Sequence, residues 1–124
     1  MNCLIVDDSP RFLDAARNLL EREGMTVLDM VSTSAEALQR AEELRPDVTL
    51  VDIELGDESG FELAGRLREV DRHQGWVILI STHAEDDYAE LIAASPASGF
   101  LPKASLSATA IRRLLRDCGD TDLG

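Results

Sequence analysis

Three aspartates stand where short apolar stretches of the chain end. Asp7 and Asp8 follow residues 2–6, and Asp52 follows residues 48–51. Carboxylates that lie close together repel one another and raise each other's pKa unless a cation holds them. The natural cation is Mg²⁺, which takes one or two carboxylates together with waters and phosphate oxygens. A single Asp after a strand more often forms a turn, but three such positions together favour a magnesium-dependent phosphate site.

Hydroxyl and amine groups follow two further apolar stretches. Ser81 and Thr82 come directly after residues 76–80, and Lys103, the only lysine of the chain, comes shortly after residues 99–101. Taken alone, the hydroxyls are typical of helix caps and the lysine of a solvated charge. Together with the aspartates, they can hold a metal ion, a phosphoryl group and a neutralising ammonium.

Five repeats of an apolar stretch and a helical stretch must position these residues. The apolar stretches are hydrophobic on both faces, which is typical of buried parallel strands. Ser9 suits the N-cap and Pro10 the first position of the first helix, which Gly24 ends, and Ser34 is expected to cap the second. The expected strands are 2–6, 26–31, 48–51, 76–80 and 99–101, and the later helices are expected at 35–44, 60–70, 85–94 and 106–117.

This alternation predicts an α/β fold, a doubly wound five-stranded parallel sheet with helices on both faces. The chain of 124 residues has the length of one domain. The Rossmann strand order and the flavodoxin-like order 2-1-3-4-5 both fit the pattern. In either order a ligand binds outside the carboxyl ends of the strands, where the winding direction reverses. The aspartates, hydroxyls and lysine are expected at that edge.

The net charge of the chain is −12 at pH 7, from 24 acidic and 12 basic side chains. Binding to nucleic acid depends on neutralisation of phosphates by Lys and Arg, so we expect no direct nucleic acid binding. No apolar stretch approaches the roughly 20 residues of a membrane helix, and the first residues lack a signal-peptide pattern. These features predict a cytoplasmic protein without a membrane segment.

In order and spacing, the motifs resemble those of the receiver domain of bacterial two-component response regulators. Lys103 follows Ser81 by 22 residues, which fits the family and selects Ser81 over Thr82 as the switch hydroxyl. The resemblance runs from residue 2 to about 117 and implies a receiver domain over 1–118 with the flavodoxin-like strand order, followed by a frayed polar tail over 119–124. The matching segments are LIVDDS at residues 4–9, VDI at 51–53, STH at 81–83 and FLPK at 100–103.

The resemblance implies that Asp52 is the phosphoacceptor. It further implies that Asp8, Asp52 and the backbone carbonyl of Glu54 contact Mg²⁺ directly, while Asp7 acts mainly through water. The phosphoryl donor would be a sensor histidine kinase or a phosphotransfer protein, and a downstream effector protein would respond. Such a domain is not an enzyme in the ordinary sense, although it assists its own phosphorylation and dephosphorylation.

The resemblance also assigns a switch. Ser81 would bind the phosphoryl oxygens, and Lys103 would pair first with the carboxylate and then with the phosphate. Phe100 would rotate inward once Ser81 moves. An added negative charge would in this way bias a two-state element near the fourth strand.

The sequence departs from the family pattern at several positions. Leu55-Gly56 replaces a common Met-Pro, which predicts a more mobile loop, and Ala104 replaces a common Pro, which removes support for a cis bond after the lysine. Thr82 replaces a small Ala that gates the phosphoryl site. Glu54 and His83 flank the site, and we expect them to tune the lifetime of the phosphorylated form.

Other functions compete with a stand-alone receiver that works by protein contact. The chain could be the amino-terminal module of a DNA-binding regulator, with Arg112, Arg113 and Arg116 at an output interface. A metal-dependent phosphatase usually has a second Asp two residues after the nucleophile, where this chain has Glu54. A degenerate receiver that binds partners without phosphorylation would not need the full acid, hydroxyl and lysine set.

Overall fold

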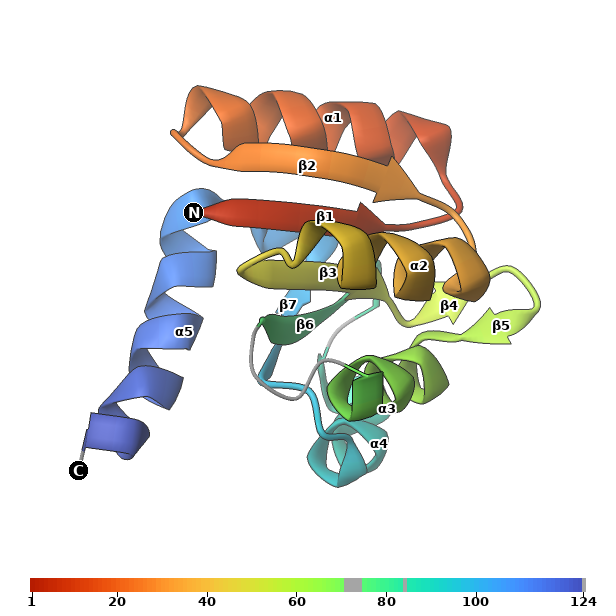
Figure 1. Ribbon diagram of the computed structural model, residues 1–124. Coiled ribbons are helices and arrows are strands. Elements are labelled where there is room, and N and C mark those ends of the chain that lie inside the picture. The colour runs from red at the N-terminus through yellow and green to blue at the C-terminus, as the bar shows by residue number, and fades with distance from the viewer. Residues whose placement is uncertain (71–74, 84, 124) are drawn as a thin grey trace.

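Five parallel strands form the central sheet of the computed structural model, which describes residues 1–70, 75–83 and 85–123 (Figure 1). Their order is β2-β1-β3-β6-β7. This order equals 2-1-3-4-5 when only the sheet strands are counted, so the flavodoxin-like order is confirmed and the Rossmann order is excluded. The strands are β1 (Asn2–Val6), β2 (Thr26–Val31), β3 (Val48–Asp52), β6 (Trp76–Ser81) and β7 (Gly99–Pro102).

Each face of the sheet has its own hydrophobic cluster because side chains alternate along a strand. In β1, Cys3 and Ile5 belong to one cluster, whereas Leu4 and Val6 belong to the other, and all four are 0% exposed. Burial raises the pKa of the Cys3 thiol to about 12. The continuous hydrophobic runs of the sequence therefore reflect burial on both faces.

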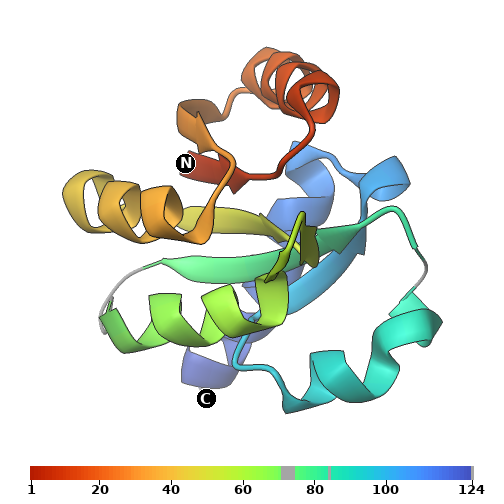
Figure 2. The same ribbon diagram turned by 90° about the vertical axis from the view of Figure 1, so that its right-hand side faces the viewer.

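The helices cover both faces, as predicted (Figure 2). Helices α1 (Pro10–Arg22) and α5 (Ala108–Leu123) pack on the cluster of Ile5. Helices α2 (Ser34–Leu44) and α3 (Gly60–Val70) pack on the opposite cluster, together with part of α4 (Ala89–Ala94). None of the helices in the described ranges combines the length and apolar character needed to span a membrane.

Local capping explains where the first two helices begin. Ser9 is the N-cap of α1, where its side chain accepts a hydrogen bond from the Phe12 N–H, and Pro10 starts the helix as expected. The expectation for α2 was wrong, because Thr33 and not Ser34 is the N-cap. Thr33 Oγ1 accepts from the Glu36 N–H at 3.2 Å, the arrangement of a T-x-x-E capping box. Ser34 is instead the first helical residue.

Four segments differ from the expected elements. Residues 54–59 form a hairpin of β4 (Glu54–Leu55) and β5 (Glu58–Ser59), where a loop was expected. A 3₁₀ turn, η1 (Glu85–Tyr88), precedes the short α4, and another, η2 (Lys103–Ser105), lies between β7 and α5. Helix α5 continues to Leu123, through most of the expected frayed tail, because no proline stops it; residue 124 lies outside the described residues.

A side chain of the first helical unit caps the last helix. Glu23, the C-cap of α1, accepts a hydrogen bond from the Ala108 N–H at 2.7 Å through its Oε1. The first N–H groups of a helix have no partner within the helix, and an acidic group is favourable there. This contact joins α1 and α5 on one face of the sheet.

Candidate functional site

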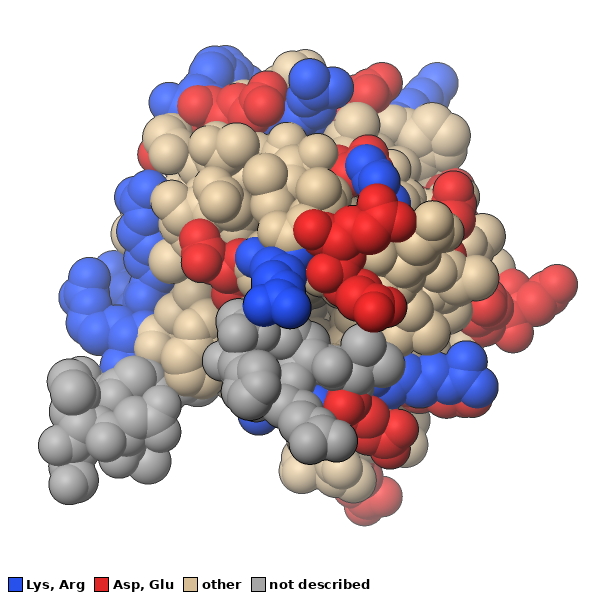
Figure 3. All heavy atoms as spheres, viewed as in Figure 1, with Lys and Arg blue, Asp and Glu red and all other residues tan. Residues whose placement is uncertain are grey.

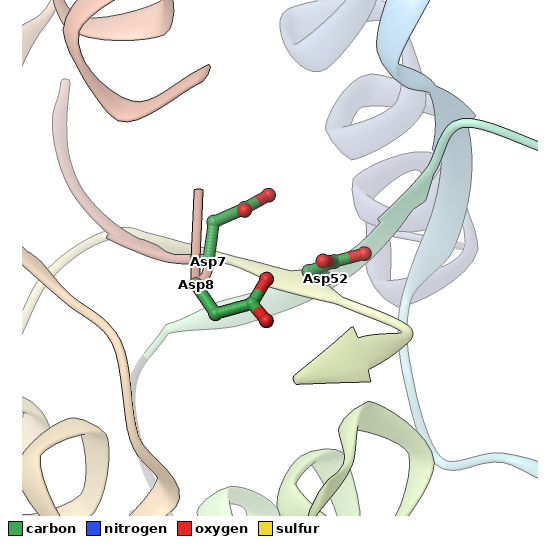
Figure 4. Close-up of side chains that lie close together, drawn as sticks. All are labelled: Asp7, Asp8 and Asp52. Carbon is green, nitrogen blue, oxygen red and sulfur yellow. The ribbon is translucent and has the colours of Figure 1, made fainter. Parts of the chain in front are cut away.

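The three aspartates meet at the carboxyl edge of the sheet. Asp7 and Asp8 follow β1, and Asp52 is the last residue of the neighbouring β3. Carboxylate oxygens of all three lie within 4.8 Å of one another, and Figure 4 shows the side chains converging from the two strand ends. Asp7 is 0% exposed and Asp52 is 6% exposed, whereas Asp8 faces solvent. The carboxyl edge of the sheet therefore concentrates negative charge in a site that is buried at Asp7 and Asp52 and open to solvent at Asp8.

Lys103 offsets part of this charge. It starts η2 directly after β7, and its Nζ lies 2.6 Å from Asp7 Oδ2 and 3.6 Å from Asp52 Oδ2. The ammonium also lies 4.3 Å from the centre of the Phe12 ring, in cation–π contact. The only lysine of the chain is thus held between two acids and an aromatic face, at the place expected from the strand ends.

One ammonium does not compensate three carboxylates. Burial, followed by the repulsion of Asp7, raises the pKa of Asp52 from 3.8 to about 6, against the opposing effects of Lys103 and of the Glu54 N–H. That N–H donates to Asp52 Oδ1 at 3.3 Å. Asp7 Oδ2 is buried and accepts no hydrogen bond of good geometry from the described part of the chain, although Lys103 is near. The site therefore holds more negative charge than its own cation neutralises.

These observations test whether a divalent cation fits. The donors are hard carboxylate oxygen atoms that lie within 4.8 Å of one another, and the raised pKa of Asp52 agrees with incomplete neutralisation by Lys103. An exposed third acid, Asp8, leaves an open side for waters. The residues present fit Mg²⁺, which keeps several waters and uses few carboxylates.

Ser81 lies beside the acidic group as the last residue of β6. Strand β6 pairs with β3 so that Asp52, the last residue of β3, lies opposite Ile80, one residue before Ser81. Ser81 is 2% exposed, and its Oγ accepts a hydrogen bond from the His83 N–H at 3.0 Å. Because the oxygen acts as an acceptor there, the hydroxyl proton can be donated to an oxygen placed near Asp52. Thr82, by contrast, is exposed.

Phe100 occupies an inward position. It is 6% exposed and packs in the cluster that contains Leu79, its neighbour across the β6–β7 pair. The structure therefore records the inward orientation that the resemblance implies for one state of the switch, and its rotation stays a prediction. The bond between Lys103 and Ala104 is trans, in line with the missing proline.

The hairpin after Asp52 explains one departure from the family pattern. Gly56 has φ +59°, in the left-handed region that favours glycine, at the turn between β4 and β5. Leu55 is buried, and the Glu58 side chain accepts a hydrogen bond from the Ser34 N–H at 2.9 Å. These contacts anchor the segment for which a mobile loop was expected.

Three residues near the site have no signal in the sequence that marks them. Phe12 contacts Lys103, as described above. Gly60 begins α3 so close to β3 that a Cβ there would overlap the backbone carbonyl of Asp52. Tyr88, the only tyrosine, donates a hydrogen bond from its hydroxyl to Glu54 Oε1 at 2.7 Å. The last contact joins residues 34 positions apart, which a local motif cannot reveal.

The fold and the site together define a doubly wound α/β domain whose carboxyl edge carries an acidic, lysine-bearing site of the kind that binds a metal and a phosphoryl group. The family model of the response regulator receiver domain matches residues 3–116. The chain belongs to this family, whose members act in two-component signalling.

Similar proteins agree with this assignment. The chain is 31% identical over 103 residues to the DNA-binding transcriptional activator EvgA of Escherichia coli, covering 83% of this chain and 50% of EvgA. An uncharacterised 14.6 kDa protein of Leptolyngbya boryana is 30% identical over 104 residues, with 79% of its length covered. The receiver domain of the regulator NarL from Mycobacterium tuberculosis superposes with a TM-score of 0.79 at 28% identity, covering 96% of this chain and 95% of that domain. The chain thus spans about half the length of the first curated relatives that it matches.

Proposed function

We propose that this receiver domain accepts a phosphoryl group on Asp52 from a sensor histidine kinase or a phosphotransfer protein in the cytoplasm, and passes the signal to an effector protein. The observation that carries the proposal is the convergence of Asp52 with two further acids, a buried hydroxyl and the only lysine at one edge. The match to the receiver-domain family supports the proposal, because receiver domains take part in this chemistry.

The chain's own groups supply positioning and charge. The Asp52 carboxylate attacks the phosphorus of a phosphohistidine, forming a P–O bond while the P–N bond breaks and its electron pair stays on the imidazole. Lys103, whose Nζ lies 3.6 Å from Asp52 Oδ2, offsets the negative charge of the incoming phosphoryl group. The Ser81 hydroxyl donates a hydrogen bond to a phosphoryl oxygen. Phosphoryl transfer depends mainly on such positioning and neutralisation.

A divalent cation completes the site. Asp8, Asp52 and the carbonyl of Glu54 would hold Mg²⁺, with Asp7 acting through water. When bound, Mg²⁺ supplies a Lewis acid that draws charge from the phosphoryl oxygens. The raised pKa of Asp52 makes this important, because a carboxylate must be deprotonated to act as a nucleophile.

A groove beside Lys103 suits a protein donor. It has a volume of about 490 Å³ and is lined by Phe12, Leu19, Ala104 and Leu106 among others. Apolar side chains of a donor protein could bind there while its phosphohistidine reaches Asp52. The net charge of −12 argues against nucleic acid as the direct partner of this domain.

The basic face of α5 is a candidate surface for the effector. Arg112, Arg113 and Arg116 are exposed, and Figure 3 shows basic side chains gathered over this part of the surface. In an acidic domain such a face favours an acidic partner surface. A solvated helix face would look the same, so an interaction screen with Arg113→Glu separates the two.

A second candidate is a receiver that is one part of a DNA-binding regulator, with boundaries at about residues 1–118. The observation that favours it is the match to half of EvgA, which is a DNA-binding activator. The Leptolyngbya relative, of which 79% is matched, favours a protein of receiver size. The length of the natural gene product decides between the two.

Intact mass spectrometry tests the phosphoacceptor. We expect one phosphoryl adduct on the wild type after incubation with acetyl phosphate and Mg²⁺, and none on Asp52→Asn. The matched control is Asp57→Asn, an exposed acid in the neighbouring hairpin, which should be phosphorylated like the wild type. An adduct on both the wild type and Asp52→Asn, or on neither, would overturn the proposal. A chelator should abolish the adduct.

A further inference from the structure

The two residues expected to tune the phosphorylated form both contact one side chain. Glu54 lies two residues after Asp52, in β4, and His83 lies two residues after Ser81, in the segment after β6. The Tyr88 hydroxyl donates to Glu54 Oε1 at 2.7 Å, and the Tyr88 ring lies edge-on to the His83 ring, with centroids 5.9 Å apart. Tyr88 therefore contacts both Glu54 and His83.

The Tyr88 ring is fixed from more than one direction. It lies 6.1 Å from the Phe61 ring at the start of α3, and it packs on the hydrophobic cluster of that sheet face. A hydrogen bond to a charged carboxylate is among the stronger ones, and it raises the pKa of Tyr88. The half-buried tyrosine therefore connects η1 to β4, to the segment after β6 and to α3.

We propose that Tyr88 is a positioning residue that holds the Glu54 carboxylate and so lengthens the lifetime of the phosphorylated form. This inference rests on the proposed phosphorylation of Asp52. It adds a residue that no motif of the sequence marks.

The reaction that ends the phosphorylated state is hydrolysis. A water oxygen attacks phosphorus opposite the P–O bond to Asp52; a new P–O bond forms, the bond to Asp52 breaks, and its electron pair returns to the carboxylate. The proton of the water passes to the released phosphate. A nearby carboxylate that is free to accept a hydrogen bond from this water would orient it and speed the attack.

Tyr88 restrains the carboxylate that could do this. Glu54 follows Asp52 closely in the chain, and its backbone N–H already contacts the Asp52 carboxylate. With Oε1 engaged by the Tyr88 hydroxyl, the Glu54 side chain is directed toward η1 and is less free to reach a water above Asp52. Loss of the hydroxyl alone would release Glu54 and leave the ring contacts with Phe61 and His83 in place.

A double-mutant cycle tests this coupling. The variants are Tyr88→Phe, Glu54→Ala and the double variant, each loaded with acetyl phosphate and Mg²⁺ and then followed by intact mass after removal of the donor. We expect Tyr88→Phe to lose its phosphoryl group about tenfold faster than the wild type, the factor that corresponds to one hydrogen bond to a charged group. In the Glu54→Ala background the same change should have no effect. Asp57→Ala, in the same hairpin, should leave the lifetime unchanged.

The outcomes are distinct. An unchanged or longer lifetime in Tyr88→Phe overturns the inference, and so does an equal acceleration in both backgrounds, which would mean that Tyr88 acts without Glu54. A second readout needs no phosphorylation: because Tyr88 is the only tyrosine, its ring signal in ¹³C-tyrosine NMR should shift in Glu54→Ala but not in Asp57→Ala. A wild type that takes up no phosphoryl group, with this NMR shift present, rejects the proposed function and the lifetime role while leaving the contact in place.

Discussion

Replacing Asp52 by Asn should stabilise the metal-free domain. Burial and the repulsion of Asp7 raise the pKa of Asp52 from 3.8 to about 6. The folded protein therefore binds the proton of Asp52 more tightly than the unfolded chain does. The contribution of Asp52 to the free energy of unfolding accordingly falls as pH rises between about 4 and about 6. Well above pH 6, where the folded Asp52 is fully ionised, the whole penalty is present. At about 1.36 kcal/mol per pKa unit, it amounts to about 3 kcal/mol.

Unfolding by urea or heat in the presence of a chelator measures this effect. At pH 8 the Asn variant should gain up to about 3 kcal/mol, or a Tm rise of roughly 10 °C for a domain of this size. At pH 5 the carboxylate is partly protonated in the folded state, and the gain should be about half as large. Mg²⁺ should stabilise the wild type more than the variant, because the variant lacks one ligand charge.

The control for this prediction is Asp14→Asn on the exposed side of α1, which removes the same charge from a residue outside the acidic group. It should change the free energy of unfolding by no more than about 0.5 kcal/mol. An Asp52→Asn protein that is no more stable than the wild type at pH 8, with the chelator present, would refute the idea that burial and the repulsion of Asp7 penalise the ionised Asp52. A gain that does not shrink at pH 5 would refute the assigned cause.

Three further predictions follow from single contacts. Phe12→Leu removes the ring beside Lys103, a contact of about 0.5–2 kcal/mol. It should slow phosphorylation by acetyl phosphate about threefold or more, and an unchanged initial rate would contradict this prediction. A melting curve of the variant checks its folding. Gly60→Ala places a methyl group against the Asp52 carbonyl and should lower the free energy of unfolding in urea by about 1–3 kcal/mol, so a neutral effect would show that α3 can shift freely. Thr33→Ala should lower it by about 1 kcal/mol through the lost N-cap, and a smaller loss than from Ser34→Ala would restore the original assignment of the cap.

The sequence predicted the strand ends and the residues that they carry. Buried parallel strands are recognisable in the sequence as apolar runs, and their carboxyl ends all lie at one edge of the sheet. The sequence alone therefore predicts that Asp7, Asp52, Ser81 and Lys103 lie together. The strand order could not be chosen from periodicity alone, because it depends on which strands pair across long stretches of chain.

The missed features depend on chemistry that is weaker or less local. Thr33 and Ser34 are both good N-caps, and the capping box with Glu36 was the available signal that favours Thr33. The hairpin at residues 54–59 is too short to show an alternating pattern. The contacts of Phe12 and Tyr88 form between distant segments, so neither residue stands out from an ordinary core aromatic in the sequence.

The contact between Glu23 and Ala108 has a consequence for the order in which the chain is made. It joins residues 85 positions apart, so it cannot form until nearly the whole domain has left the ribosome. The cluster around Cys3 and Ile5 is completed by Ile111 of the same last helix. Until α5 docks, a nascent chain exposes the part of this apolar sheet face that α1 does not cover, and such surfaces promote aggregation. Synthesis of the last sixteen-residue helix, α5 (Ala108–Leu123), therefore ends the period in which the growing chain is most exposed to misassembly.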